Sequence, residues 1–300
     1  MERVSELYRE HGKFLWALSF RMTGSAADAD DVVQETFIRA LAREQPVAET
    51  RAWLTRVALN LATDVLRRRK RDGYVGPWLP SPVETPEAEV LEEERPEGRY
   101  AMLESVSFAF MLVLEQLTEK ERAVLVLRDV FDYSVREAAG LLEMTESNVK
   151  TTHHRARAAI KGYDEVRATS KQRAGLAGAA LRAFLAALAA RDLPAIEAAL
   201  ASDARSLSDG GGEFIAARVA VIGAAKVARF YRNVSRGAMA PVHARIAWMN
   251  GLPALVLALP PRAPPFASRL VMQIEVDDTG AITTVYSQLA TRKLTAVSFA

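Results

Sequence analysis

Hydrophobic residues recur at helical spacing from the start of the chain. The stretch DADDVVQETFIRAL places Val33, Phe37 and Leu41 on one face, with polar residues between them. Ser25, followed three residues later by Asp28, is a capping signal for the start of this helix. The pattern therefore predicts an amphipathic helix that buries a single apolar face.

A second helix is predicted over 51–71, where the sequence reads RAWLTRVALNLATDVLRRRKR. Its expected apolar stripe consists of Trp53, Val57, Leu61 and Val65. Trp53 could instead stack on a nucleotide base, although a tryptophan on an apolar stripe belongs more often to a core. The helix ends in five consecutive basic residues, 67–71, which suit a surface that contacts phosphates.

Two capping boxes mark another helical region over about 105–163. Thr118 with Glu121, and Ser134 with Glu137, have the spacing in which side chain and backbone cap each other at a helix start. The second of these helices, VREAAGLLE, is followed by a short turn and the basic segment TESNVKTTHHRARAAIKG. Two short helices joined in this way, the second one basic, predict a helix-turn-helix.

The remainder of the chain changes from helices to strands. Alanine-rich helices precede the glycine turn in SLSDGGGEFIAAR, and a further helix is predicted at about 221–231. Two strand pairs follow, VHARIAWMNGLPALVLAL with its turn at Asn250-Gly251, and RLVMQIEV with AITTVYSQ joined by DDTG. Helices followed by an antiparallel sheet predict an α+β domain over 171–300.

The segment between the two helical regions has the composition of a linker. Residues 73–82, GYVGPWLPSP, contain three prolines and two glycines, which suit neither a helix nor a central strand. Residues 83–99 then carry seven glutamates against two arginines. We call the first segment the strap, because its prolines make it stiff and its tryptophan makes it partly apolar.

The composition of the 300 residues predicts a globular protein with a sizeable core. Half of the residues are apolar, a quarter are charged, and the net charge is +2. The absence of cysteine excludes disulfides, thiolate metal sites and cysteine nucleophiles. The charged N-terminus lacks the apolar core of a signal peptide, and no apolar run reaches the roughly 18–20 residues of a membrane span. We therefore expect a cytoplasmic protein with no membrane contact, no cofactor and no metal.

The second helix of the helix-turn-helix concentrates polar side chains that suit DNA. Lys150, Thr151, His154, Arg155 and Arg157 lie within about two turns. Arginine and lysine can reach phosphates or guanine edges, and threonine can touch a thymine methyl group. The alternative is an ordinary solvated basic face, which the preceding capped helix and short turn disfavour.

These motifs together resemble a known family. DADDVVQETFIRAL, AWLTRVALNLATDVLRRRKR and LTEKERAVLVLRDVFDYSVREAAGLLEMTESNVKTTHHRARAAI look like regions 2 and 4 of bacterial extracytoplasmic-function sigma factors. The match covers most of residues 8–162. The segments YVGPWLPSP, SDGGGEF and NGLPALVL resemble the subgroup with a fused SnoaL-like domain of the NTF2-like cone fold. The subgroup's usual motif near the end reads ATRKL here, and its DGGGK reads DGGGE.

The resemblance implies a multidomain fold of two all-α sigma domains followed by an α+β cone. The expected division is a sigma-2 domain at 1–72, a linker at 73–104, a sigma-4 helix-turn-helix at 105–163 and the SnoaL-like domain at 171–300. The implied activity is promoter-specific initiation of transcription with core RNA polymerase. The implied contacts on the enzyme are the clamp helices of its largest subunit and the flap of its second subunit.

The resemblance also assigns roles to individual residues. The side chains expected to dock on the polymerase clamp are Asp28, Asp31, Gln34 and Glu35. Those expected to open and read the −10 element are Arg56, Asn60, Arg67 and Arg68. Those expected in the major groove at the −35 element are Lys150, Thr151, His154 and Arg155. The family often has arginine at the position of Thr152.

For the linker and the C-terminal domain the resemblance implies a regulatory contact. The residues expected to make it are Trp78, Leu79 and Pro80 of the strap and Asp209, Gly210, Gly211 and Gly212 of the glycine turn. The tail after the last strand is a further contact point unless it frays. The glutamates at 84–97 would act as an electrostatic mimic of nucleic acid in a polymerase channel.

Two other functions stay open at this point. A one-component regulator would use the helix-turn-helix on an operator and bind a ligand in its C-terminal domain, whereas in a sigma factor that domain could sense a small apolar ligand as a regulator. A SnoaL-type enzyme would use a proton-moving group, for which Asp209, Tyr231 and His243 are the available residues, although their spacing does not demand catalysis. Only the sigma-factor hypothesis needs both the polymerase-docking helix and the helix at 51–71, so we expect no enzymatic activity.

Overall fold

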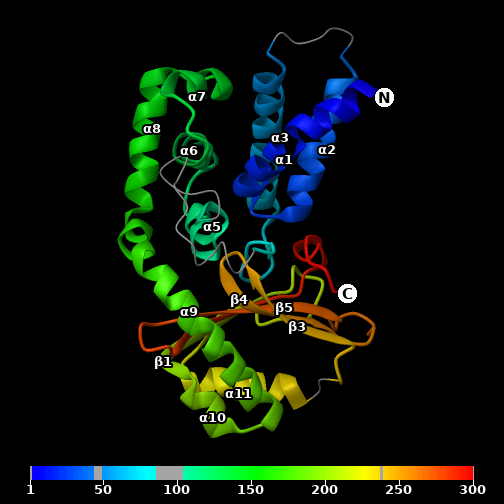
Figure 1. The fold of residues 1–300 in the computed structure, drawn as a ribbon, viewed down its shortest axis with the longest axis vertical. Helices are drawn as coiled ribbons and strands as arrows, with labels where there is room; N and C mark the ends of the chain where they lie inside the picture. Colours follow the sequence, from blue (N-terminus) through cyan, green and yellow to red (C-terminus); the bar gives the residue numbers. More distant parts are fainter. Residues whose placement is uncertain (1, 44–48, 86–103, 237–238, 300) are drawn as a thin grey trace. The chain divides into compact units, whose positions relative to one another are not determined.

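The computed structural model describes most of the chain as helices and strands (Figure 1). The described residues are 2–43, 49–85, 104–236 and 239–299. Most of the acidic stretch of the linker therefore lies outside the described residues. Among those that are described, no helix combines the length and the apolar content that a membrane crossing requires.

The chain divides into two compact units. Met1–Gly73 and Glu94–Glu165 form the helical unit, whereas Tyr74–Glu93 and Val166–Ala300 form the sheet unit. The strap therefore belongs to the same unit as the C-terminal domain, although the sequence separates them by about 80 residues.

The helical unit is built from the predicted helices and several short turns. Its elements are α1 (Glu2–Thr23), α2 (Ala26–Leu41), α3 (Thr50–Asp72), η1 (Glu104–Val106), α5 (Phe108–Leu114), α6 (Glu119–Leu125), the π-helical turn η2 (Val126–Val130), α7 (Val135–Leu142), α8 (Glu146–Ala159) and the start of α9 (Lys161–Ala190). The predicted helix-turn-helix is confirmed as α7 and α8, with Glu143 in the left-handed conformation at the turn.

The helix starts are those that the sequence predicts. The Ser25 hydroxyl accepts a hydrogen bond from the Asp28 amide, and both predicted capping boxes are present, at Thr118 and at Ser134. Each cap satisfies backbone groups that a helix terminus leaves without an intrahelical partner. The predicted apolar face of α2 is confirmed at its centre, where residues 33 and 37 are buried, but Leu41 at its last position is exposed.

The predicted apolar stripe of α3 is wrong by one position. Trp53, Val57, Leu61 and Val65 are only half-buried. The buried residues are instead Leu54, Thr55, Ala58, Leu59, Ala62 and Leu66. One position is about 100° around a helix, and α3 turns this neighbouring stripe inward because it packs against both α1 and α2. Trp53 lies under the guanidinium of Arg43, 5.0 Å from its ring centroid.

A fully buried arginine joins the two helical regions of this unit. Arg122 on α6 donates through Nε to the Leu114 carbonyl at 3.0 Å and through Nη1 to the Met22 carbonyl at 2.5 Å. Its remaining nitrogen pairs with the carboxylate of Glu115. A buried cation is tolerated only when every donor finds a partner, so Arg122 fixes the end of α1 against α5 and α6.

A second arginine reaches the same place from α3. Arg69 donates to the Glu115 carboxylate at 2.6 Å and to the Thr23 carbonyl at 2.9 Å. Carbonyls in the last turn of a helix have no intrahelical donors and carry partial negative charge, so cations stabilise them. Arg21, in the same last turn of α1, is also buried, and burial lowers its pKa to about 10. Its Nε donates a hydrogen bond to the Ser105 hydroxyl at 2.7 Å.

The sheet unit contains a six-stranded mixed sheet with helices on one face. Its elements are the rest of α9, α10 (Leu193–Ala198), β1 (Leu200–Asp209), β2 (Val221–Ile222), α11 (Ala224–Arg236), β3 (His243–Met249), β4 (Leu252–Ala258), β5 (Arg269–Val276), β6 (Ile282–Gln288) and η3 (Thr291–Lys293). The strand order is β2-β1-β6-β5-β4-β3. The predicted antiparallel sheet is wrong at one pair, because β1 runs parallel to β6.

The predicted strand pairs at the C-terminal end are confirmed. β3 and β4 form a hairpin whose turn residues, Asn250 and Gly251, both have positive φ, as a two-residue hairpin requires. β5 and β6 pair antiparallel across the DDTG turn. The chain after the glycine turn forms the two-residue strand β2, which pairs antiparallel with β1.

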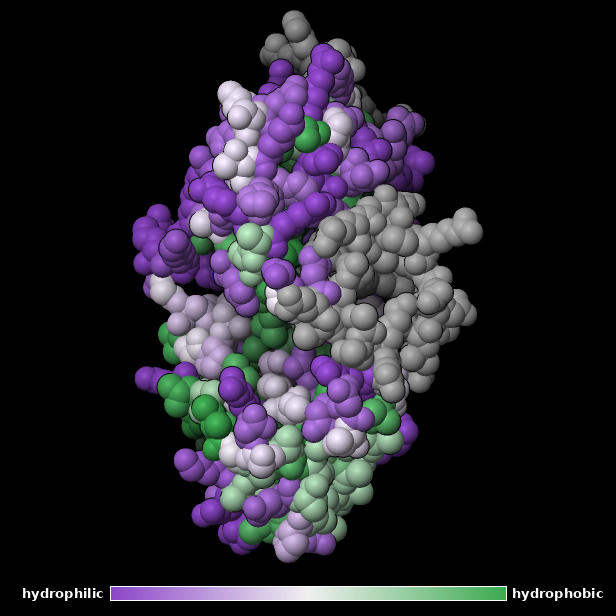
Figure 2. Space-filling view, turned by 90° about the vertical axis from the view of Figure 1, so that its left-hand side faces the viewer, coloured by the Kyte–Doolittle hydropathy of each residue, from purple (hydrophilic) through white to green (hydrophobic). Residues whose placement is uncertain are grey.

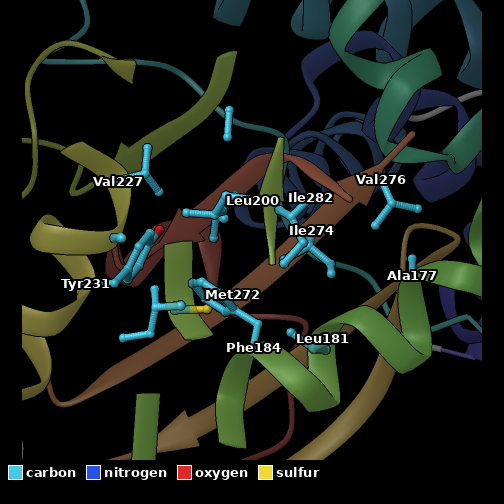
Figure 3. Packing of buried hydrophobic residues seen from close by; sticks show 14 residues of the cluster. Ala177, Leu181, Phe184, Leu200, Val227, Tyr231, Met272, Ile274, Val276 and Ile282 are labelled. Atoms are coloured by element: carbon cyan, nitrogen blue, oxygen red, sulfur yellow. The ribbon is translucent and has the colours of Figure 1, made fainter. Parts of the chain in front are cut away.

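The helices cover one face of the sheet, and their apolar side chains pack against it (Figure 3). Leu181 and Phe184 from α9 and Val227 from α11 lie against strand residues such as Met272 and Ile274. The cluster is built from residues with little or no exposed area. The interior of the cone is thus packed with side chains.

The tail packs on the other face of the sheet and does not fray. Leu294 and Val297 join a second apolar cluster with Met249, Val256 and Val271.

The outer surface of the two units differs in character on the side that Figure 2 shows: hydrophilic residues predominate over the helical unit, whereas apolar and mixed patches are more frequent over the sheet unit.

We expect Arg122→Met to lower the free energy of unfolding of the helical unit by about 3–5 kcal/mol, because it leaves the carbonyls of Leu114 and Met22 without their donor and removes one of the two cations paired with Glu115. Urea unfolding of the full chain, followed by circular dichroism, measures this change. Arg39→Met is the control, since Arg39 pairs with Glu35 on the surface and such a pair contributes about 1 kcal/mol or less. Equal effects of the two substitutions would contradict the role given to Arg122.

Candidate functional site

Helix α2 presents a polar, acidic stripe on its outer side. Asp31 and Gln34 are exposed, and Asp28 and Glu35 are half-buried at its edge. Glu35 pairs with Arg39 one turn away, 2.9 Å between Oε1 and Nε. The four residues predicted to dock on polymerase therefore share one accessible surface of the helix.

The four residues predicted to read the −10 element lie along α3 in two different environments. Asn60, Arg67 and Arg68 are exposed. Arg56 is half-buried and donates to the Gly140 carbonyl at 2.9 Å, and its Nη1 lies 3.6 Å from the Glu143 carboxylate. The guanidinium of Arg56 is thus engaged by the first helix of the helix-turn-helix and its turn.

Helix α8 presents all four residues predicted to read the −35 element. Lys150, Thr151, His154 and Arg155 are exposed, while the opposite face of the helix is buried through Val149, Thr152 and Ala156. Arg155 is held loosely, with its Nε 3.8 Å from the Glu121 carboxylate. These side chains form one continuous polar surface suited to a groove.

The inner side of α8 is held by an ionic cluster that sequence reasoning missed. Asp129, only 2% exposed, accepts hydrogen bonds from His153 at 2.9 Å and from two nitrogens of Arg157 at 2.9 and 2.5 Å. Burial alone would raise the pKa of Asp129, but the hydrogen bonds and charges of these two partners hold it below its usual value. Arg157, which the basic sequence also offered to DNA, is therefore a positioning residue.

In the sheet unit the strap lies against the end of β1. The buried carboxylate of Asp209 accepts hydrogen bonds from the Tyr74 hydroxyl at 2.5 Å, the Leu79 amide at 2.9 Å and the Gly211 amide at 3.1 Å. Residues 79–82 of the strap are buried. The predicted residues of strap and turn are thus brought together around one carboxylate, and we call this arrangement the clasp.

The tail completes the clasp with a cation that the sequence did not single out. Lys293, 4% exposed, places its ammonium 3.7 Å from the ring centroid of Trp78 and 4.0 Å from the Asp209 carboxylate. A desolvated ammonium over an indole face is a favourable cation–π contact. The ATRKL motif therefore supplies the lysine that faces strap and turn together.

The glycines of the turn are required by close contacts. A Cβ at Gly210 would lie 2.6 Å from the Phe214 carbonyl, and one at Gly211, where φ is +61°, would lie 2.7 Å from Ala290. Both distances are too short for a side chain. The neighbouring Glu213, where the family has lysine, accepts a hydrogen bond from the Thr291 amide at 3.4 Å. Turn and tail are thereby linked.

The residues that directly follow the strap are tied to the β3–β4 hairpin. Val83 exchanges two hydrogen bonds with Asn250, 3.0 Å to the side chain and 2.9 Å to the backbone. Glu84 forms a two-bond ion pair with Arg245, at 2.9 and 3.1 Å. The strap is therefore fixed at both ends and along its buried centre.

A cavity of about 440 Å³ lies beside the clasp. Its lining includes Val75 and Gly76 of the strap, the glycine turn, the segment after the turn and Pro265. Both apolar and polar groups face it. It is a place where a small molecule would touch the strap directly.

The three residues considered for catalysis do not converge. Asp209 ends β1 and belongs to the clasp, while His243 begins β3 at the far edge of the sheet. Tyr231 lies on the face of the sheet that the helices cover, where it is hydrogen-bonded to Ser206 at 2.9 Å and to Ser287 at 3.2 Å. Burial raises its pKa. Within the described ranges, no group of three or more metal-ligating side chains is placed to hold an ion.

Comparisons with known proteins agree with this geometry. Family models for sigma-70 region 2 and sigma-70 region 4 match residues 7–72 and 107–160. The chain is 34% identical over 227 residues to the ECF RNA polymerase sigma factor SigJ of Mycobacterium tuberculosis, covering 75% of this chain and 70% of SigJ. It is 33% identical over 159 residues to SigL of the same organism, covering 52% of this chain and 85% of SigL. The crystal structure of SigJ matches with a TM-score of 0.69 at 27% identity, covering 99% of this chain and 100% of that chain.

We expect Asp209→Asn to loosen the strap, because hydrogen bonds to a charged acceptor are each worth about 1.5–3 kcal/mol. Hydrogen–deuterium exchange at the Leu79 amide should rise by about 10–100-fold. Asp203→Asn, an exposed aspartate on the same strand, is the matched control and should leave the exchange unchanged. Unaltered protection of Leu79 in the Asp209 variant would rule out the clasp as the restraint.

Proposed function

Because the chain belongs to the extracytoplasmic-function (ECF) RNA polymerase sigma factors, we propose that its polar helices divide the steps of initiation among themselves. The chain is an alternative sigma factor, which binds core RNA polymerase and directs transcription from specific promoters. Its fold is the expected one, two all-α sigma domains followed by an α+β cone. The assignments below concern which residues do which part of this work.

The acidic stripe of α2 docks on the clamp helices of the largest polymerase subunit. The support is its accessibility: the polar groups at 28, 31, 34 and 35 face outward from a helix whose opposite side is fully buried. The sigma-4 domain in turn contacts the flap of the second subunit. Two separate anchors place the two DNA-reading domains on one enzyme surface.

Helix α3 opens and reads the −10 element. Asn60 is exposed and can hydrogen-bond an unpaired base, and the basic end of the helix offers point charges to phosphates. Arg56 can bind DNA together with these residues only after its guanidinium has broken its contacts with the Gly140 carbonyl and the Glu143 carboxylate. The role of Arg56 thus couples −10 reading to a rearrangement of α7.

Helix α8 reads the −35 element in the major groove, where a recognition helix fits. The observation that carries this assignment is the separation of its two faces. The outer face offers Lys150, Thr151, His154 and Arg155, while Asp129 holds the inner face through two side chains of the same helix. The readers are therefore presented from a rigidly positioned support.

The C-terminal domain regulates initiation by holding the linker. If the whole linker, residues 73–104, were free and extended, its 32 residues would span about 110 Å. The 18 residues of 86–103 alone span at most about 60 Å. Capture by the cone of residues 74–85, which include most of the strap and the three residues after it, therefore restricts how the two DNA-reading domains can separate. A small ligand in the cavity beside Val75 and the glycine turn would act on this restraint directly.

Asn60→Ala should reduce promoter opening while binding to core polymerase is unchanged, because the amide reads a base that is unpaired only after opening. Permanganate footprinting reports the opening, and a core-binding assay reports the docking. Asp64→Ala, one turn along the same helix, is the control and should open the promoter normally. Unchanged opening in the Asn60 variant would remove the assignment.

Arg155→Ala should weaken −35 engagement by about 1–3 kcal/mol if the guanidinium makes a bidentate base contact. The measurement is binding of the holoenzyme to a promoter and to the same promoter with its −35 element scrambled. The difference between the two fragments should shrink in the variant. An equal loss on both fragments would mean that Arg155 contacts phosphate rather than bases.

Truncation should separate the two effects of the C-terminal domain. A chain ending near 287 loses Lys293 and the rest of the tail, and a chain ending near 170 loses the whole cone. The first should change transcript yield in one direction and the second differently, since the clasp restrains the free protein and also orders the linker in the bound one. In vitro transcription with core polymerase measures both. If both truncated chains transcribe like the full chain, the domain has no regulatory role.

A further inference from the structure

The charges of this chain are distributed unevenly between its parts. Residues 166–300 carry sixteen arginines and lysines against eight aspartates and glutamates, whereas residues 1–165 carry 23 against 29. The imbalance is concentrated in 214–274, which contain eight basic residues and no acidic one. A segment of that length in a chain with 37 acidic residues would ordinarily mix both signs, so its charge calls for a physical explanation.

Helix α11 displays the largest share of these cations on one side. Its inner face is buried through Val227, Ala228 and Tyr231. Its outer face consists of residues spaced by three and four positions, which place them in one stripe along the helix. This stripe contains Lys226, Arg229, Asn233 and Arg236, all exposed, with the half-buried Arg232 at its flank.

The three exposed cations of this stripe form no ion pair in the part of the chain that the structure describes. Among the described residues, no ion pair involves Lys226, Arg229 or Arg236, and the Nε of Arg229 donates only to the carbonyl of Ala225 in its own helix, at 3.1 Å. Some cations elsewhere in the sheet unit are paired, such as Arg173 with Asp278 at 2.7 Å and Arg245 with Glu84 at 2.9 Å. The stripe is therefore an unneutralised positive surface on a folded helix.

We propose that this stripe of α11 is a nucleic-acid-binding surface that contacts the phosphate backbone of promoter DNA outside the −10 and −35 elements. The span from Lys226 to Arg236 is about 15 Å. Duplex DNA carries one negative charge per about 1.7 Å of axis, so several phosphates lie within reach of such a span. Lysine, arginine and asparagine are all side chains that bind phosphate oxygens without reading sequence.

The acidic linker of the same chain is the competing partner. The one glutamate of that stretch within the described residues, Glu84, pairs with Arg245 on β3 and not with α11. A sigma factor bound to a promoter also lies beside duplex DNA. The density of negative charge along DNA is higher than that of a linker with seven glutamates. DNA is therefore the occupant that the charges of α11 fit best.

The test compares two triple variants with equal change in charge. Lys226→Gln, Arg229→Gln and Arg236→Gln remove the stripe. Arg182→Gln, Arg191→Gln and Arg205→Gln remove three other exposed cations of the sheet unit and serve as the control.

Holoenzyme made with the stripe variant should bind a promoter fragment about tenfold more weakly at 0.1 M salt. The plot of log affinity against log salt should become shallower by about 2 to 3, since each lost phosphate contact removes about 0.9 from the slope. The fold-change should be the same when the −10 and −35 elements are scrambled, which separates this surface from the two reading helices. The control should bind within about twofold of the unaltered protein.

Three outcomes would overturn the proposal: an unchanged affinity and slope in the stripe variant, an equal loss in the control, or tighter DNA binding by the stripe variant. The last would mean that the stripe holds the acidic linker, and faster proteolysis within 86–103 would accompany it. If the stripe variant unfolds, Lys226→Arg with Arg229→Lys and Arg236→Lys keeps the charges and should retain both affinity and slope. A loss in that folded variant would also refute a contact based on charge alone.

Discussion

The buried carboxylate of Asp209 is the constraint on which the arrangement of the sheet unit depends. A charge with no exposed area is tolerated only if hydrogen-bond donors or cations replace the water it has lost. Here the donors come from the strap and the glycine turn, and the nearest cation, Lys293, comes from the tail. Because one group needs all three segments, the strap, turn and tail form a single body, although they lie far apart in the sequence.

Conformational entropy opposes the clasp. Each residue that is ordered costs about 1–2 kcal/mol of conformational free energy, and the prolines of the strap lower that cost because their φ angles are restricted before the strap is bound. The charge-assisted hydrogen bonds to Asp209, each worth about 1.5–3 kcal/mol, and the burial of Leu79 favour the bound strap. Because these contributions have opposite signs, a partner or ligand that replaces some of the hydrogen bonds can shift the strap toward release.

Local sequence signals predicted the helices, their caps, the helix-turn-helix and the β3–β4 hairpin, because each depends on residues a few positions apart. The signals failed where tertiary packing decides. The buried stripe of α3 is displaced by one position because two helices flank it, and the parallel pairing of β1 with β6 joins segments that no local pattern relates. The candidate residues of the strap and turn were found through resemblance. Lys293, Arg122 and Asp129 were missed, since their roles arise only from partners distant in the sequence.

Each unit holds, in an internal contact, a group to which we assign a part in DNA reading. In the helical unit Arg56 is engaged by Gly140 and Glu143, and in the sheet unit the linker between the reading domains is engaged by Asp209. A partner can shift such equilibria only by binding the released forms more tightly than the engaged ones, and a shift from 1:99 to 99:1 takes about 5.5 kcal/mol. In the function that we propose, core polymerase contributes two anchors and promoter DNA a third, so no single contact has to supply the whole difference. Selectivity would then follow, because full release would require the enzyme and the correct promoter together.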